Sequence, residues 1–169
     1  MQFTDIQSFI SHYQNVRART RRLLLVVPPD RLEWTYQAGR FTIGDQIRHI
    51  AAIERFLYVE TALGRRSRYN GCGPDIARGH AATLAYFDRC HAETLACLQE
   101  ITPTRLQEKC YPLGGSGMAV WKWLRLLPEH EIHHRGQLYL YLGMLGIKTP
   151  PVFGLTSEEL AAYGAGGDT

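Results

Sequence analysis

The sequence predicts an all-α fold, a four-helix bundle, and two observations support this prediction. Four long segments carry apolar residues at the three- and four-residue spacing of amphipathic helices. No segment shows a convincing strand pattern, and no internal repeat is visible. Packing four such helices side by side buries one apolar face of each. The connections are long enough for one crossover, so the sequence leaves the connectivity of the helices open.

The first two helices are bounded by prolines and by an N-cap. Apolar residues recur at helical spacing over residues 5–27, and Pro28-Pro29 ends this first helix. An aromatic-rich connection follows. Thr42 is predicted to cap a second helix at residues 43–63, since Asp45 stands three residues further on, where a capping-box residue lies.

Two further long helices and a short one complete the prediction. Pro74 suits the first turn of a third helix that reaches about Glu100, after a connection rich in glycine and arginine. A glycine-rich loop then leads to a fourth helix at residues 118–145. The capping-box spacing of Thr156 and Glu159 predicts a short C-terminal helix.

The composition is that of an ordinary globular protein. The chain of 169 residues fits a single domain, residues 1–169, with 45% apolar and 21% charged residues. A net charge of +3 does not predict a nucleic-acid partner, and the longest apolar run is too short to span a membrane. The N-terminus lacks a signal-peptide pattern, so we expect a cytoplasmic protein. Four cysteines without a C-x-x-C pair predict neither a disulfide framework nor a zinc ribbon.

Several polar residues are assigned to the surface. A run of basic residues on a helix is most often a solvated face, so we expect the first-helix arginines in solvent or at the rim of an interface. Three histidines in polar surroundings are expected at the surface or at the edge of the bundle, and Arg135 is expected to point outward. The first-helix arginines are Arg17, Arg19, Arg21 and Arg22, and the three histidines are His12, His80 and His91.

The fourth predicted helix contains three histidines within five residues: His130, His133 and His134. A buried imidazole without a partner costs free energy, so this cluster needs an explanation. At roughly 100° per residue, His130 and His134 lie about 40° apart on the face that should meet the core. Such a pair can hold a divalent metal ion, although satisfied core histidines explain the pair equally well. His133 lies to one side, so we place it at the edge of the site.

A metal site built on this pair needs a third ligand from another helix. The best candidate is His49, the only histidine of the second predicted helix. Asp45 lies one turn earlier and is predicted to orient the His49 ring.

Residues 130–134 also match H-E-x-x-H, the zinc metalloprotease signature in which the glutamate, here Glu131, is the general base. The longer metzincin pattern fails, because Gly136 comes one residue too early and no third histidine follows. The sequence also predicts no strand that would hold a peptide substrate. The protease is therefore the weakest interpretation of this motif.

The chain resembles the DinB-like (DinB/YfiT-type) family of metal-binding four-helix bundles over most of its length. The resemblance rests on FTIGDQIRHIA at residues 41–51 with Glu54, on HEIHHRGQL at residues 130–138 and on LGIKTPP at residues 145–151. It implies a four-helix bundle, frequent homodimers and one divalent transition-metal ion, nickel or zinc. The ligands that it implies are His49, His130 and His134.

Three neutral histidines leave the charge of an ion uncompensated and at least one coordination position open, as in a catalytic site. The motif and the resemblance together predict a metal-dependent transferase, similar to thiol S-transferases, or a hydrolase. The expected substrate is a small electrophile, with a low-molecular-weight thiol as the expected partner. No dedicated general base stands out, and the candidates for contacts behind the ligands or with substrate are Asp45, Glu131, His133 and Gln137.

Two other functions remain open at this point. The first is a non-catalytic module that binds metal or sequesters a small molecule. The second is a helical interaction protein whose histidines are merely buried. Metal analysis separates the second from every interpretation that needs an ion.

Overall fold

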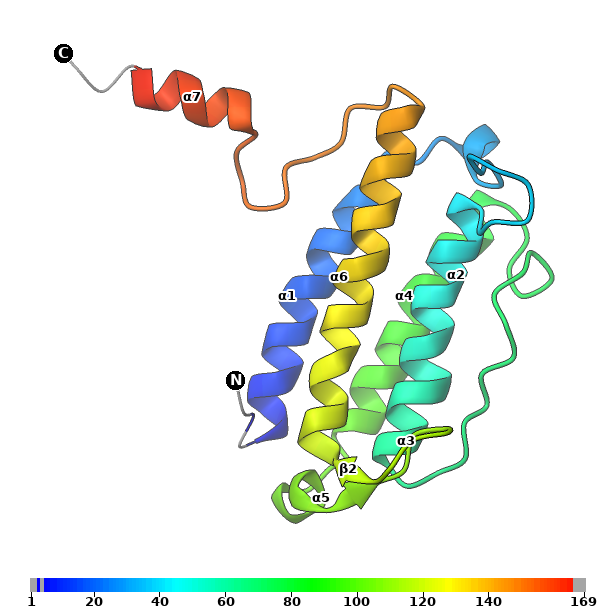
Figure 1. Cartoon of the computed structure of the whole chain (residues 1–169), viewed down its shortest axis with the longest axis vertical. Coiled ribbons are helices and arrows are strands. Elements are labelled where there is room, and N and C mark those ends of the chain that lie inside the picture. The colour runs from blue at the N-terminus through cyan, green and yellow to red at the C-terminus, as the bar shows by residue number, and fades with distance from the viewer. Residues whose placement is uncertain (1–2, 4, 166–169) are drawn as a thin grey trace.

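The computed structural model describes residues 3 and 5–165, and its four long helices pack side by side (Figure 1). These helices are α1 (Ile6–Leu24), α2 (Ile43–Ile53), α4 (His80–Leu98) and α6 (Val120–Met144). The α2 helix continues directly into a π-helical turn, η2 (Glu54–Val59), and into α3 (Glu60–Ala62). The predicted four-helix bundle is therefore confirmed.

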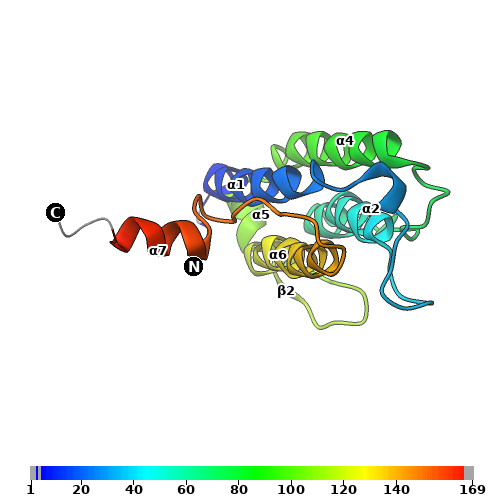
Figure 2. The ribbon, with the colours of Figure 1, turned by 90° about the horizontal axis from the view of Figure 1, so that it is seen from above.

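Short elements occupy the connections. A 3-10 turn, η1 (Pro29–Arg31), follows α1, and α5 (Pro103–Gln107) follows α4. The strands β1 (Lys109–Cys110) and β2 (Met118–Ala119) pair in antiparallel fashion before α6. The predicted C-terminal helix, α7 (Ser157–Ala165), lies away from the four long helices (Figures 1 and 2). Among the described residues, no helix has the length and apolar character needed to cross a membrane.

The bundle contains one crossover connection. The α1 and α6 helices lie next to each other and run in the same direction, while α2 and α4 run the opposite way (Figures 1 and 2). The α6 helix contacts both α1 and α2, and α4 contacts α2 and α1. Because α2 and α4 are parallel and consecutive, residues 63–79 return along the length of the bundle between them. This connection resolves the connectivity that the sequence left open.

Two helices begin later than the sequence predicts. The α4 helix begins at His80 instead of Pro74, because Gly79 has a φ of 82° and interrupts a helix there. The α6 helix begins at Val120, because Met118–Ala119 pairs with β1 as a strand. A strand of two residues is too short to carry the alternation by which strands are predicted.

The predicted caps form as reciprocal pairs. The Thr42 hydroxyl accepts a hydrogen bond from the backbone N–H of Asp45 at 2.9 Å, and the Asp45 carboxylate accepts one from the backbone N–H of Thr42 at 3.0 Å. Thr156 and Glu159 make the same exchange at the start of α7. These bonds satisfy backbone donors that have no partner within the helix, and they fix where α2 begins.

The core consists of two apolar clusters with a polar layer between them. One cluster includes Phe9 and Leu124 and lies where α1, η2 and the first half of α6 meet. The other includes Ile47 and Leu142 and joins α2 and α4 to the later halves of α1 and α6. Between the two levels, the helices contribute the buried or half-buried residues of the polar layer, which are Arg17, Glu54, His91 and Glu131.

Arg17 is the centre of this polar layer. Its Nη2 atom forms ion pairs with Glu54 and with Glu131, the latter at 3.3 Å. The Tyr13 hydroxyl accepts a hydrogen bond from Arg17 and donates one to Glu131, both at 2.9 Å. A buried carboxylate is destabilising unless it is compensated, so Arg17 makes the burial of both glutamates possible. The layer therefore fixes how α1, η2 and α6 face one another.

Arg17 and Arg135, which the sequence assigned to the surface, are buried instead, and His91, expected at the surface or at the edge of the bundle, is half-buried. Arg17 is 4% exposed, and His91 Nδ1 lies 2.8 Å from a Glu54 carboxylate oxygen. Arg135 is 5% exposed, and its Nη1 donates to the Val16 carbonyl at 3.2 Å. The prediction was wrong because the charge pattern of one helix does not show which partners a neighbouring helix supplies.

Replacing Arg17 with methionine is expected to lower the free energy of unfolding by about 3–5 kcal/mol, because two buried carboxylates lose their cation. Urea unfolding measures the loss. Arg125→Met is the matched control, since Arg125 forms an exposed ion pair with Glu129, and its expected change is within about 0.5 kcal/mol. Adding Glu131→Gln to Arg17→Met should restore part of the loss. Equal losses for the two arginine variants would contradict this account of the layer.

Candidate metal centre

Two neighbouring helices bring three histidines together beside the polar layer. His130 and His134 stand one turn apart on α6, and His49 faces them from α2. Each offers one ring nitrogen, and these three atoms lie within 4.8 Å of one another. The ring centroids of His49 and His134 are 4.7 Å apart, and those of His130 and His134 are 4.6 Å apart. The trio ranked first by the sequence is therefore one cluster in space.

The spacing of the ring nitrogens fits a metal ion. His49 Nε2 and His130 Nε2 are 3.2 Å apart. Two nitrogens that each lie about 2.0–2.1 Å from a tetrahedral ion are separated by about 3.3 Å. The observed distance matches this value, so the cluster is a candidate site for a divalent metal ion.

The imidazoles are held in the neutral form that metal ligands need. Burial and, to a smaller extent, the neighbouring His134 together lower the pKa of His49 to about 4. Burial, followed by the nearby His134 and His49, lowers the pKa of His130 to about 3. Burial also lowers the pKa of His134. Neutral rings keep the nitrogen lone pairs available, because only a protonated ring loses them.

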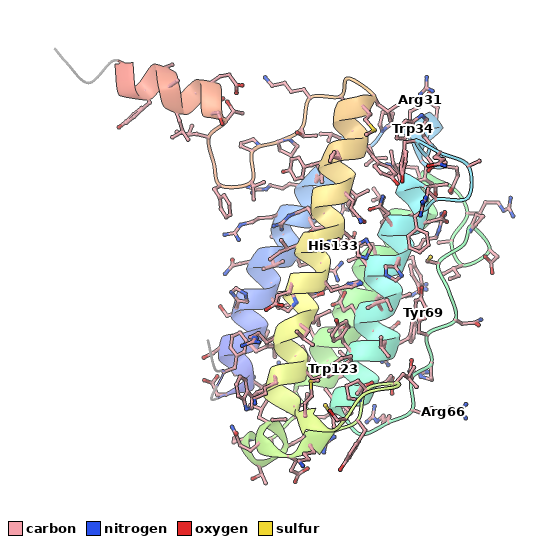
Figure 3. All side chains as sticks on the ribbon, viewed as in Figure 1. Arg31, Trp34, Arg66, Tyr69, Trp123 and His133 are labelled. Carbon is pink, nitrogen blue, oxygen red and sulfur yellow. The ribbon has the colours of Figure 1, made fainter. Side chains whose placement is uncertain are left out.

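Hydrogen bonds at Nδ1 orient two of the three rings. His49 Nδ1 lies 2.9 Å from the hydroxyl of Tyr69, which stands on the crossover connection beside α2 (Figure 3). His134 Nδ1 lies 2.8 Å from Gln137 Oε1. Because the Gln137 oxygen can only accept, the neutral His134 ring donates from Nδ1–H and keeps Nε2 as the acceptor. A neutral His49 ring that donates to Tyr69 keeps Nε2 as an acceptor in the same way. His130 Nδ1 is buried and has no hydrogen-bond partner among the described residues.

Gln137 links the cluster to His133, and both were candidates from the sequence. Gln137 Nε2 lies 3.0 Å from His133 Nε2, while Gln137 Oε1 receives the bond from His134. The exposed His133 therefore fixes which way the Gln137 amide points. His133 takes part in the orientation of His134 without facing the cluster itself.

Asp45 does not contact His49, which differs from the prediction. Its carboxylate caps α2 through Thr42 and pairs with Arg48 Nη2 at 2.8 Å. The fully buried Arg48 in turn donates from Nε to the Cys72 carbonyl at 2.8 Å. Asp45 therefore supports the crossover connection that carries Tyr69, and a tyrosine orients His49 where an aspartate was expected. No periodic pattern in that connection marks Tyr69 in advance.

Glu131 also lies outside the cluster, although it follows His130 in the chain. A step of about 100° along a helix turns its side chain toward α1, where it is fully buried against Arg17 and Tyr13. It is neither a contact for substrate nor the free general base that the H-E-x-x-H interpretation requires. The geometry argues against a metalloprotease.

A pocket of about 590 Å³ opens next to the histidine cluster. It lies between α6 and residues 36–46, and His134 and Gln137 form part of its wall. The remaining lining residues are Tyr36, Gly39, Arg40, Phe41, Gln46, Leu140, Tyr141 and Met144. This volume is within the range of about 300–1,000 Å³ in which proteins bind small molecules.

The fold and the site together define the class of this protein. It is a four-helix bundle in which three neutral imidazoles form a candidate site for a single metal ion. The sequence pattern that describes the DinB superfamily matches residues 12–138, a region that includes all three histidines. The chain belongs to the DinB superfamily.

The chain is also similar to a curated protein and to solved structures. YrdA of Bacillus subtilis (strain 168), described as an uncharacterized protein, is 23% identical over 162 residues, which are 96% of each chain. The DinB-like protein YjoA of B. subtilis has a similar fold, with a TM-score of 0.71, 20% identity, and coverage of 88% of this chain and 99% of its own. A DinB-like protein of Bacillus cereus ATCC 10987 reaches a TM-score of 0.72 at 18% identity, over 87% of this chain and 97% of its own.

The fold is also similar to that of YfiT from B. subtilis. The TM-score is 0.69 at 17% identity, over 88% of this chain and 91% of YfiT. YfiT is described as a probable metal-dependent hydrolase with an unusual four-helix bundle topology. The resemblance to DinB/YfiT-type proteins and the four-helix fold are thus confirmed.

The metal-free protein is expected to lose stability as the pH falls from about 7 to about 5, at about 1–2 kcal/mol per buried imidazole. Burial lowers the folded-state pKa of His130 and of His91 to about 3, whereas unfolded imidazoles titrate near 6.5. Protons therefore bind the unfolded chain first, and stability present above pH 6.5 is lost below it. Urea unfolding with a chelator measures the loss, which should be smaller in His91→Gln. A parent protein equally stable at both pH values would contradict the expectation.

Proposed function

We propose that this protein is a metal-dependent enzyme that uses His49, His130 and His134 to hold one divalent ion. In this proposal it activates a nucleophile, either water or a low-molecular-weight thiol, toward a small electrophile. The observation that carries the proposal is the convergence of three neutral imidazoles beside a pocket of small-molecule size. A purely structural role for the histidines would not require their lone pairs to converge.

The donor set supports a transition metal. Imidazole nitrogens suit zinc and nickel, and the spacing of His49 Nε2 and His130 Nε2 suits tetrahedral geometry. Three neutral ligands leave the positive charge of an ion uncompensated and leave at least one position for another ligand. When bound, such an ion supplies a Lewis acid that makes a nucleophile at neutral pH.

The protein's own side chains position this chemistry. His134 belongs to both the cluster and the pocket wall, so a ligand in the pocket lies next to the site. Gln137 and Tyr69 hold two of the rings with Nε2 facing inward. Among the described residues that line the pocket there is no carboxylate, which favours activation by an ion over activation by a general base.

The likeness to YfiT favours hydrolysis, since that protein is described as a probable metal-dependent hydrolase. The sequence resemblance favours transfer of a thiol. Both chemistries need the same three ligands and differ only in the nucleophile. A comparison of turnover with and without a thiol therefore separates them.

Protein purified without an affinity tag is expected to carry about one equivalent of nickel or zinc per chain. His49→Ala removes one of three ligands and should abolish stoichiometric metal, as measured by plasma mass spectrometry after dialysis. His12→Ala is the matched control, because His12 is exposed on α1 and should leave the content unchanged. Equal metal content in the parent protein and in His49→Ala would contradict the proposed ligand set.

Turnover of a model electrophile should depend on the same cluster. The parent protein is expected to consume a small aryl halide or ester, tested with a panel of thiols and with water alone. The His134→Ala variant is expected to have a kcat/KM at least about a hundredfold lower. Thiol dependence identifies a transferase and its absence a hydrolase. A rate unaffected by His134→Ala would contradict a catalytic role and leave a passive metal-binding module.

A further inference from the structure

The pocket beside the histidine cluster contains a buried carboxamide with no assigned role. Gln46 stands on α2 one turn before His49 and lines the pocket, yet it is only 1% exposed. Its Oε1 atom has no hydrogen-bond partner among the residues that the structure describes. Buried polar atoms are nearly always bonded, and an unpaired one destabilises the fold. An unpaired acceptor on a residue that lines the pocket is a group that a ligand with a donor can satisfy.

The rest of the wall restricts what this ligand is. The aromatic side chains of Tyr36, Phe41 and Tyr141 contribute flat apolar surface. The hydroxyl of Tyr141 is already engaged, because it donates to the Phe41 carbonyl at 3.2 Å. Gln46 Oε1 is therefore the buried acceptor of this wall that has no partner among the described residues.

The charge of the pocket lining is the second feature that restricts the ligand. Among the described residues that line the pocket, Arg40 is the only one with a charged side chain, and this side chain is exposed. It forms no ion pair with any described residue. An exposed cation in the lining, with no carboxylate among the other lining residues, favours an anionic ligand.

We propose that this pocket binds a small organic anion whose flat apolar body carries an N–H or O–H donor to Gln46 and a negative group to Arg40. Gln46 is the residue that determines specificity for the donor. That the ligand is a substrate rests on the proposed function, whereas its binding does not. Discrimination arises because an analogue without the donor leaves the Gln46 acceptor buried and unpaired.

Two matched pairs of aryl carboxylates test the donor. Hippurate carries an amide N–H where benzoylpropionate carries a methylene, and phenyllactate carries a hydroxyl that phenylpropionate lacks. Calorimetric titration of the metal-loaded protein should give at least about tenfold tighter binding of the donor-bearing member in one pair or both. Hippuramide, which is neutral, should bind more weakly than hippurate. Equal affinity within both pairs, or no binding of any probe at millimolar concentration, would overturn the proposal.

Two variants assign the effect to the named residues. Gln46→Met keeps the size of the side chain and removes the acceptor, so it should abolish discrimination within the pairs. Its melting temperature should equal or exceed that of the parent, which a merely structural glutamine would not show. Arg40→Gln should reduce the preference for hippurate over hippuramide, whereas Arg66→Gln, exposed on the crossover connection, should not. Discrimination that persists in Gln46→Met would overturn the assignment.

A third variant separates this inference from the proposed function. His49 contributes to the cluster but does not line the pocket. His49→Ala should therefore lose metal and still discriminate within the pairs. Loss of metal with retained discrimination supports both proposals. Discrimination in a parent that carries no metal would support the pocket alone and would contradict the metal centre.

Discussion

One buried arginine between two buried glutamates sets the geometry on which the site depends. Arg17 of α1 reaches Glu54, which follows α2 without a break, and Glu131, which is the neighbour of His130 on α6. These ion pairs are stable only while the helices keep one rotation and one axial position, because a displaced carboxylate would be buried without a cation. The same rotation brings the Nε2 atoms of His49 and His130 to 3.2 Å from each other, because Glu131 directly follows His130 on α6. The polar layer and the histidine cluster therefore depend on the same orientation of the helices.

The fold follows from the sequence to the extent that local patterns determine it. Apolar periodicity, prolines and the Thr42 cap define the four helices, because they act within a few residues along the chain. The late start of α4 depends on the backbone conformation of Gly79 and on the path of the crossover, which periodicity does not show. The burial of Arg17 and Arg135 depends on partners from other helices, and for this reason the surface assignment was wrong.

The residues of the candidate site could likewise be predicted only in part from the sequence. The spacing of His130 and His134 places both on one helix face, and His49 is the only histidine of its helix, so the trio could be selected from the sequence. The groups that orient the rings could not all be selected. Gln137 is three residues from His134 and follows from helix geometry, whereas Tyr69 reaches His49 from a connection that Arg48 anchors through long-range bonds. Asp45 and Glu131 lie close in sequence to the histidines, but they form ion pairs with Arg48 and Arg17 instead.

The proposed function requires one metal ion among the three imidazoles. Diffraction from crystals of the metal-loaded protein, measured on both sides of the absorption edge of the bound element, locates such an ion directly. We expect one anomalous peak, about 2.0–2.1 Å from the Nε2 atoms of His49, His130 and His134. A peak held by other residues, or three imidazoles that keep this arrangement in loaded crystals with no peak between them, would contradict it.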